Sequence, residues 1–297
     1  MNNTLQIGLI QMACGDDPAD NLTRAIAKIE TAADRGAQII CLQELFKSRY
    51  FCQAIDTDRF GLAEAVDEDS GTVQRFRELA MELEAVLIVP LFEKRGTGIY
   101  HNAAVVIDAD GRYLGKYRKM HIPDDPHYYE KYYFTPGDLG YKTFKTRYAE
   151  IGVLICWDQW FPEAARLTAM RGAEIIFYPT AIGHLISEKQ SRDMAYCEAW
   201  KVVQRGHAVA NACYVAVVNR VGFEADPGGE EGLEFWGQSF VTDPLGKVAA
   251  SAAEDREAIV VCPVDLSFVE RIRTDIAFPF RDRRVDSYRE ITELYLE

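Results

Sequence analysis

An internal duplication narrows the possible folds of this chain more than any other feature of its sequence. A helix-like segment, an Arg-Gly-Ala triplet and a short apolar strand follow one another around DRGAQIICLQEL (34–45) and again in PEAARLTAMRGAEIIFYPTA (162–181). Two other segments, 101–119 and 236–251, each resemble two strands joined by an Asp-containing turn that ends in glycine. The pattern predicts an α/β protein made of two similar halves.

The remaining apolar and amphipathic segments fit the same scheme. Residues 5–12 and 214–222 are strand-like, whereas 70–85 and 191–212 have helical periodicity. The strands are continuous apolar runs, so we expect them to be buried on both faces. No Ser-, Gly- or Pro-rich linker separates the halves, and we therefore predict one domain spanning 1–297, with two sheets covered by helices.

Two irregular segments are predicted to be long loops of the kind that carries function. Residues 124–138 are rich in tyrosine, and residues 223–232 have the sequence FEADPGGEEG. The second segment has no lysine and no GxxxxGK[ST] spacing, which argues against a nucleotide site and favours a flexible loop.

Composition and charge exclude several classes of function. The 297-residue chain has a formal charge of −13, which repels phosphate backbones and anionic lipids, so we expect no nucleic-acid partner and no membrane association. Its seven cysteines form no CxxC pair, and its five histidines lack HxH or HxxxH spacing, so we expect no disulfide framework, no metal and no cofactor. No secretion signal or spanning segment is recognisable at the N-terminus or elsewhere, which predicts a cytoplasmic protein.

Three side chains stand where strands end. Cys156 closes the apolar run IGVLIC, and Pro162 begins a predicted helix six residues later, so we expect the helix dipole to lower the pKa of the thiol. Glu44 ends the strand IICLQE, and Lys119 precedes the break at Pro123. From position alone the alternatives are a packing role for the cysteine, a solvated or capping glutamate, and a solvated lysine.

Taken together, these residue types suit the hydrolysis of a C–N bond. A thiolate attacks a carbonyl carbon, a carboxylate moves the proton from the thiol to the departing amine, and an ammonium stabilises the oxyanion. A cysteine–histidine protease using His101 or His207 is an alternative, and a non-enzymatic interaction protein is another. Mutation of each histidine would test the protease hypothesis, and labelling of the thiol would distinguish an enzyme from a non-enzymatic protein.

The contexts LQELF around Glu44, YRKMHIP around Lys119 and GVLICWDQWFPEAAR around Cys156 resemble the Glu-Lys-Cys motifs of the nitrilase (carbon–nitrogen hydrolase) superfamily, in the same order and with similar separations. The resemblance covers nearly the whole chain and implies a four-layer α-β-β-α sandwich. It implies that Glu44 is the general base and acid, Cys156 the nucleophile and Lys119 the oxyanion stabiliser, assisted by the backbone N–H of Trp157. Glu130, eleven residues beyond the lysine, matches a second glutamate of the family.

The residues after the nucleophile indicate the branch. Branches that hydrolyse N-carbamoyl amino acids place arginines there to clamp a carboxylate, whereas this chain has DQW. Acidic and aromatic residues around the site would suit a cation: Asp125, Tyr128, Trp160 and Glu188. Longer stretches, such as KMHIPDDPHYYEKYYFTPGD, resemble the branch that hydrolyses N-carbamoylputrescine, so the implied substrate is a small cationic carbamoyl amine. The arginines of RDRR (281–284) keep a β-ureidopropionase-like activity on N-carbamoyl-β-alanine open as the alternative.

Superfamily members commonly assemble as homodimers or larger oligomers. The aromatic and apolar segment near the C-terminus, from about 265 to 297, fits an arm that contacts another subunit. We therefore expect a homo-oligomer, with RDRR either in a subunit contact or in a surface salt-bridge patch.

Overall fold

Two six-stranded sheets with the same pairing pattern form the centre of the molecule. The computed structural model describes residues 4–188, 193–229, 231–276 and 278–297. The first sheet has the order β15 (Ala258–Asp265), β1 (Thr4–Gln11), β2 (Ile39–Leu42), β3 (Val86–Gly96), β4 (Ile99–Ile107) and β5 (Tyr113–Arg118). The second has the order β6 (Thr143–Lys145), β7 (Glu150–Val153), β8 (Ile175–Pro179), β10 (Tyr214–Val218), β13 (Phe240–Thr242) and β14 (Val248–Ser251).

Reading across either sheet in this order, the strand pairs are antiparallel, parallel, parallel, antiparallel and antiparallel. Strands β1, β2 and β3 of the first half thus correspond to β7, β8 and β10 of the second. The duplication predicted from the sequence is confirmed by this topology.

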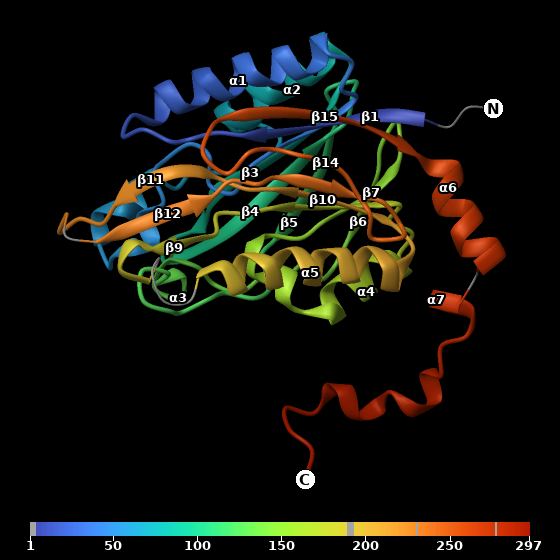
Figure 1. Cartoon of the computed structure of the whole chain (residues 1–297). Coiled ribbons are helices and arrows are strands. Elements are labelled where there is room, and N and C mark those ends of the chain that lie inside the picture. Colours follow the sequence, from blue (N-terminus) through green and yellow to red (C-terminus); the bar gives the residue numbers. More distant parts are fainter. Residues whose placement is uncertain (1–3, 189–192, 230, 277) are drawn as a thin grey trace.

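Helices cover the outer faces of the two sheets, so the layers run α-β-β-α as expected (Figure 1). Helices α1 and α2 pack on the first sheet, and α4 and α5 pack on the second. The α-helices are α1 (Pro18–Asp34), α2 (Gly71–Leu83), α3 (Glu130–Tyr133), α4 (Pro162–Met170), α5 (Asp193–Asn211), α6 (Leu266–Arg271) and α7 (Phe278–Arg281). Shorter 3₁₀ or π turns lie at Phe51–Gln53, Thr57–Leu62, Cys156–Trp160, Ile186–Glu188, Ile272–Ile276, Val285–Ser287 and Arg289–Thr292. One apolar core contains side chains from both sheets. The central strands β2, β8 and β10 are buried along their whole length, as expected for strands covered on both faces, whereas the edge strands β6 and β14 are partly exposed.

Local sequence explains where α1 begins and ends. The carboxylate of Asp17 accepts a hydrogen bond from the backbone N–H of Ala19, and Pro18 occupies the first helical position. The helix stops before Gly36, which has a φ of +90°. The predicted helix–Arg-Gly-Ala–strand unit is confirmed here.

A third, small sheet corrects two sequence predictions. It pairs β9 (Gly183–Leu185), β12 (Gly232–Trp236) and β11 (Val221–Ala225). The segment 223–232 is therefore a β-hairpin whose ends are strands, and not a loop throughout. The strand predicted to begin at Trp236 is interrupted, because Gly237 and Gln238 have φ values of +55° and +51° and the chain crosses into the second sheet only at Phe240.

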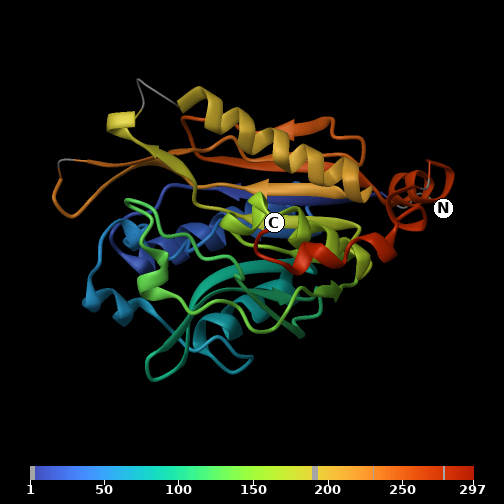
Figure 2. The same cartoon turned by 90° about the horizontal axis from the view of Figure 1, so that it is seen from below.

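The C-terminal segment leaves the body of the protein after α7, whose Phe280 still packs against the core (Figure 1). Seen from below, the segment runs back across the molecule (Figure 2). Nearly all side chains of 281–297 are exposed, including Leu294 and Tyr295. Within the described residues, no helix is both long enough and apolar enough to cross a membrane.

Candidate active site

The ends of three strands bring Glu44, Lys119 and Cys156 into one buried cluster. Glu44 follows β2, Lys119 follows β5, and Cys156 opens the turn after β7. The ammonium of Lys119 donates hydrogen bonds to Glu44 Oε1 at 2.8 Å and to Glu130 Oε2 at 2.6 Å. The side chains of the lysine and both glutamates are completely buried, so the cluster is shielded from bulk water.

The two oxygens of Glu44 have different surroundings. Oε1 accepts from Lys119 and from the side-chain amide of Asn102 at 2.7 Å. Oε2 is buried and has no hydrogen-bond partner among the described residues. One oxygen is thus fixed, while the other is available to take a proton.

Cys156 has a left-handed backbone conformation, with φ +44°, and is almost completely buried. Burial raises the pKa of its thiol well above the usual value, and the charge of Glu44 raises it further, although Lys119 opposes both effects. The expected lowering of this pKa is therefore wrong for the resting protein. Helix α4 does begin at Pro162 as predicted, but Cys156 lies one 3₁₀ turn before it.

The neighbouring charges determine the protonation of Lys119 and Glu130. Burial alone would lower the pKa of Lys119, but the carboxylates of Glu130 and Glu44 outweigh it and raise the pKa well above normal, so the side chain stays an ammonium. Burial raises the pKa of Glu130 to about 7, against the opposing charge of Lys119. The hydroxyl of Tyr50 donates to Glu130 Oε1 at 2.6 Å.

Asp158 joins the cysteine turn to the segment that carries Lys119. Its carboxylate accepts from the hydroxyl of Tyr117 at 2.8 Å, from the backbone N–H of Ile155 at 2.9 Å and from that of His121 at 3.0 Å. The ring nitrogen Nδ1 of His121 lies 2.7 Å from the same carboxylate. The nucleophile and the lysine are therefore held in register by one buried side chain.

A cavity of about 530 Å³ leads to Cys156. Its walls include four residues predicted from the sequence, Asp125, Tyr128, Trp157 and Trp160. Sequence reasoning missed other residues that line the cavity or contact the cluster, namely His184, Tyr196, Trp236, Tyr50 and Asn102. Glu188 ends the turn Ile186–Glu188, but its side chain lies outside what the structure describes.

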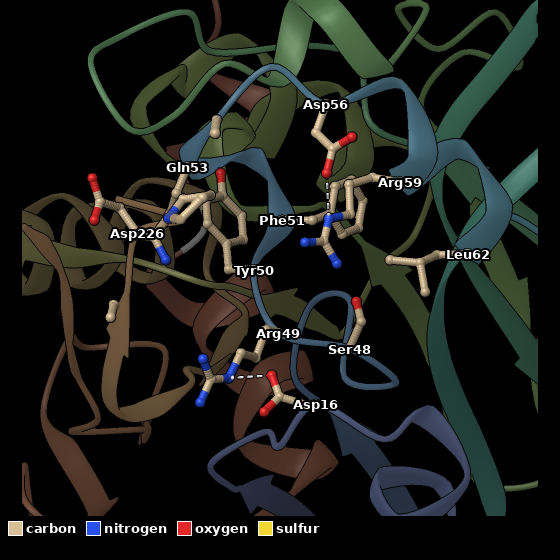
Figure 3. A pocket seen from close by; sticks show the side chains of 13 residues that line it. Asp16, Ser48, Arg49, Tyr50, Phe51, Gln53, Asp56, Arg59, Leu62 and Asp226 are labelled. Atoms are coloured by element: carbon tan, nitrogen blue, oxygen red, sulfur yellow. Dashed lines mark hydrogen bonds and ion pairs between the residues drawn. The ribbon is translucent and has the colours of Figure 1, made fainter. Parts of the chain in front are cut away.

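A smaller cavity of about 160 Å³ lies beside the segment 48–54, which includes the Tyr50 that bonds Glu130 (Figure 3). Tyr50 and Gln53 line it, and four of its charged side chains form ion pairs, Arg49 with Asp16 and Arg59 with Asp56.

The alternative partners proposed for the cysteine lie elsewhere. His101 bonds the carbonyl of Thr135, and His207 bonds the carbonyl of Gln159. The groups that influence the Cys156 thiol are carboxylates and a lysine. This arrangement does not support a cysteine–histidine protease.

A thiol beside a carboxylate and an ammonium is the arrangement of a hydrolase that works through a covalent thioester. The chain belongs to the carbon-nitrogen hydrolase family, whose model matches residues 6–274, and it is a hydrolase of carbon–nitrogen bonds. The resemblance seen in the sequence is confirmed.

Individual relatives are similar over almost the full length. The N-carbamoylputrescine amidase of Oryza sativa is 44% identical, over 98% of this chain and 95% of its own. The citrullinase of Francisella tularensis is 41% identical, over 98% and 99%. The crystal structure of a carbon-nitrogen hydrolase from Helicobacter pylori superimposes with a TM-score of 0.93 at 41% identity, covering 99% of this chain and all of its own.

Proposed function

We propose that this enzyme hydrolyses N-carbamoylputrescine to putrescine, carbon dioxide and ammonia. The observation that carries the proposal is the cavity above Cys156, whose described lining residues are mostly aromatic or apolar and include the carboxylate of Asp125 but no arginine or lysine. Such a wall suits a carbamoyl amine with a cationic tail better than one with a carboxylate tail. The names of several relatives, 43–45% identical, point to the same substrate.

In the first half of the proposed reaction, the sulfur of Cys156 attacks the ureido carbonyl carbon. Glu44 accepts the thiol proton through Oε2 and passes it to the departing nitrogen, so ammonia leaves and a carbamoyl thioester remains. The ammonium of Lys119 and the backbone N–H of Trp157 stabilise the oxyanion. Because burial keeps the resting thiol protonated, attack requires a base at this position.

In the second half, Glu44 removes a proton from water, which attacks the thioester carbonyl. The sulfur leaves and recovers its proton from Glu44, and the released carbamate decomposes to putrescine and carbon dioxide. Glu130 holds Lys119 in place throughout by its 2.6 Å contact. No cofactor or metal takes part in these steps.

The tail of the substrate occupies the aromatic part of the cavity. We assign its ammonium to Asp125 and Glu188, and its methylenes to Tyr128 and Trp160. The hydroxyl of Tyr128 donates to the carbonyl of Gly183 at 3.1 Å and accepts from its N–H at 3.0 Å, so this wall is held rigidly.

A second candidate is an N-carbamoyl amino acid, such as citrulline or N-carbamoyl-β-alanine. The similarity to a citrullinase favours it. The basic run 281–284 does not, because Arg281 and Arg284 pair with Asp282 and Asp286 of their own segment.

Ammonia release from N-carbamoylputrescine, citrulline and N-carbamoyl-β-alanine tests the proposal directly. We expect the highest kcat/KM for N-carbamoylputrescine and no turnover by Cys156→Ala. Cys262→Ala, which removes a buried thiol of the first sheet, is the matched control and should remain active. A preference for either amino acid, or activity in Cys156→Ala, would contradict the assignment.

We also propose that the protein is a homo-oligomer whose segment from about 265 to 297 contacts another copy. Exposed apolar side chains along 285–296 support this, since a solvated arm of this composition is costly in water. Light scattering should give a multiple of the 33.6 kDa chain mass, and a chain ending at residue 281 should give a smaller assembly. A monomeric full-length chain would refute the proposal.

A cytoplasmic location completes the proposed function. All seven cysteines are free thiols, as expected for a reducing compartment.

A further inference from the structure

A buried arginine from the second half of the chain contacts the loop that carries Glu44. Among the described residues, Arg220 is the largest fully buried side chain after Trp200. Its Nη1 donates to the carbonyl of Ser48 at 2.9 Å, and its Nη2 donates to the carbonyls of Leu45 at 2.9 Å and Glu44 at 3.1 Å. Three carbonyls of one loop therefore converge on a single guanidinium.

Glu224 of β11 completes this arrangement. Its Oε1 accepts from Arg220 at 2.6 Å, and its Oε2 accepts from the backbone N–H of Tyr50 at 2.6 Å. The hydroxyl of Tyr50 in turn bonds Glu130, which bonds Lys119. Figure 3 shows Ser48 and Tyr50 on this loop, beside the smaller cavity.

The loop needs such support for two reasons. Leu45 has a φ of +51°, a left-handed conformation that a leucine rarely adopts. The loop carbonyls that face Arg220 are buried and have left the sheet, so they need donors from elsewhere. The planar fork of an arginine supplies several donors in fixed directions, which a lysine cannot do.

We propose that Arg220, oriented by Glu224, is a positioning residue for the catalytic base, Glu44. The proposal rests on the function proposed above, in which Glu44 moves the proton. Because the guanidinium holds the main chain at Glu44 itself, it determines where the unpartnered Oε2 lies relative to the thiol. Loss of the fork would displace the base while leaving the cavity for the substrate tail intact, because none of the residues lining that cavity is Arg220 or Glu224.

The test compares wild type, Arg220→Lys and Glu224→Gln in two assays. The amplitude of the p-nitrophenolate burst from p-nitrophenyl acetate counts intact nucleophiles. This leaving group needs no proton, although the rate of the burst still depends on removal of the thiol proton by Glu44. Ammonia release from N-carbamoylputrescine and the steady ester rate after the burst both depend on Glu44. For Arg220→Lys we expect a normal burst amplitude, a KM within a few-fold of wild type, and turnover per intact site reduced on the order of 100-fold. Glu224→Gln, which keeps one of the two hydrogen bonds, should have a smaller effect.

Arg273→Lys is the matched control. Arg273 also donates to two backbone carbonyls, of Ala212 and Ala173, but it lies on the segment after α6. Its turnover per intact site should equal that of wild type.

An Arg220→Lys enzyme with wild-type turnover per intact site would overturn the positioning role. If its burst amplitude were reduced at the same time, Arg220 would serve only stability. A wild-type protein that gives the burst but releases no ammonia refutes the proposed substrate instead, and the steady ester rate then still decides the role of Arg220.

Discussion

The ammonium of Lys119 lies 2.8 Å from Glu44 Oε1, and neither side chain has any exposed surface. Two buried charges are stable only because they compensate each other and because Asn102 and Glu130 complete their hydrogen bonds. Removing the charge of Lys119 would leave two carboxylates uncompensated in a dry interior, whereas neutralising Glu44 still leaves Lys119 paired with Glu130. Variants of the cluster must therefore keep its shape if their effects on chemistry are to be separated from effects on folding.

Glu44→Gln keeps the shape and the acceptor for Lys119 but cannot carry a proton between thiol, leaving group and water. Proton transfer by a positioned side chain contributes roughly 10²–10⁴-fold to rate, and we expect kcat to fall by that amount with KM little changed. Steady-state ammonia release measures both constants. Glu64→Gln, which alters a half-buried carboxylate paired with Lys47, is the control and should keep wild-type kcat. Retention of activity in Glu44→Gln would exclude it as the base.

Glu130 provides a test based on pH. Burial raises its folded-state pKa to about 7, above the ordinary value of 4.5 that applies when the chain is unfolded. The folded protein therefore binds more protons than the unfolded one between these values, and the contribution of Glu130 to stability decreases as pH rises through 7. Glu130→Gln cannot titrate.

Urea unfolding of wild type and Glu130→Gln at pH 5, 6, 7 and 8 measures this contribution. We expect the stability of wild type relative to the variant to decrease from pH 5 to pH 7 and to level off towards pH 8. A difference that is constant, or that grows with pH, would show that Glu130 is already ionised at pH 5.

The fold was largely predictable because its signals are local. Apolar runs and helical periodicity follow from neighbouring residues, and the repeated helix, Arg-Gly-Ala and strand units indicated two halves. The β11–β12 hairpin was missed because its strands contain glycine and glutamate. In addition, β12 is stabilised by pairing with β9, where the paired residues Glu234 and His184 are 50 residues apart in sequence. The interruption at Gly237 and Gln238 depends on a backbone conformation that the apolar pattern does not reveal.

The site was predictable only in part. Glu44, Lys119 and Cys156 were identified as catalytic candidates from their residue types, their positions at strand ends and the family resemblance. Tyr50 and Asn102 were missed because their partners are 80 and 58 residues away in sequence and meet them only in the folded chain. The prediction of a lowered pKa for the Cys156 thiol was wrong for the same reason. Burial by segments distant in sequence raises this pKa and outweighs the effect of the nearby helix terminus.

Asp158→Asn should weaken the connection between the cysteine turn and Lys119. The carboxylate accepts hydrogen bonds from the hydroxyl of Tyr117 and from two backbone N–H groups, and it faces a ring nitrogen of His121. An amide at this position would direct its N–H₂ group at one of these donors. Hydrogen bonds to buried charged groups contribute about 2 to 3 kcal/mol, so we expect the free energy of unfolding to fall by that amount. Denaturant unfolding gives this value. Asp110→Asn, which alters an exposed aspartate, should change it little, and equal effects of the two variants would contradict a special role for Asp158.

Gly137 lies directly against the backbone that precedes Lys119. Its N–H donates to the carbonyl of Lys119 at 2.8 Å, and a Cβ added at this position would lie 2.2 Å from the carbonyl oxygen of Arg118. Gly137→Ala must therefore push the lysine-bearing strand end away, and we expect a loss of about 1 to 3 kcal/mol in the free energy of unfolding together with a lower kcat. Gly61→Ala, where an added Cβ meets nothing within 4 Å, is the control for the loss of a glycine and should keep both values. Because the displaced group is the ammonium that holds Glu44, a Gly137→Ala enzyme with lowered stability but wild-type kcat would show that the position of Lys119 tolerates this shift.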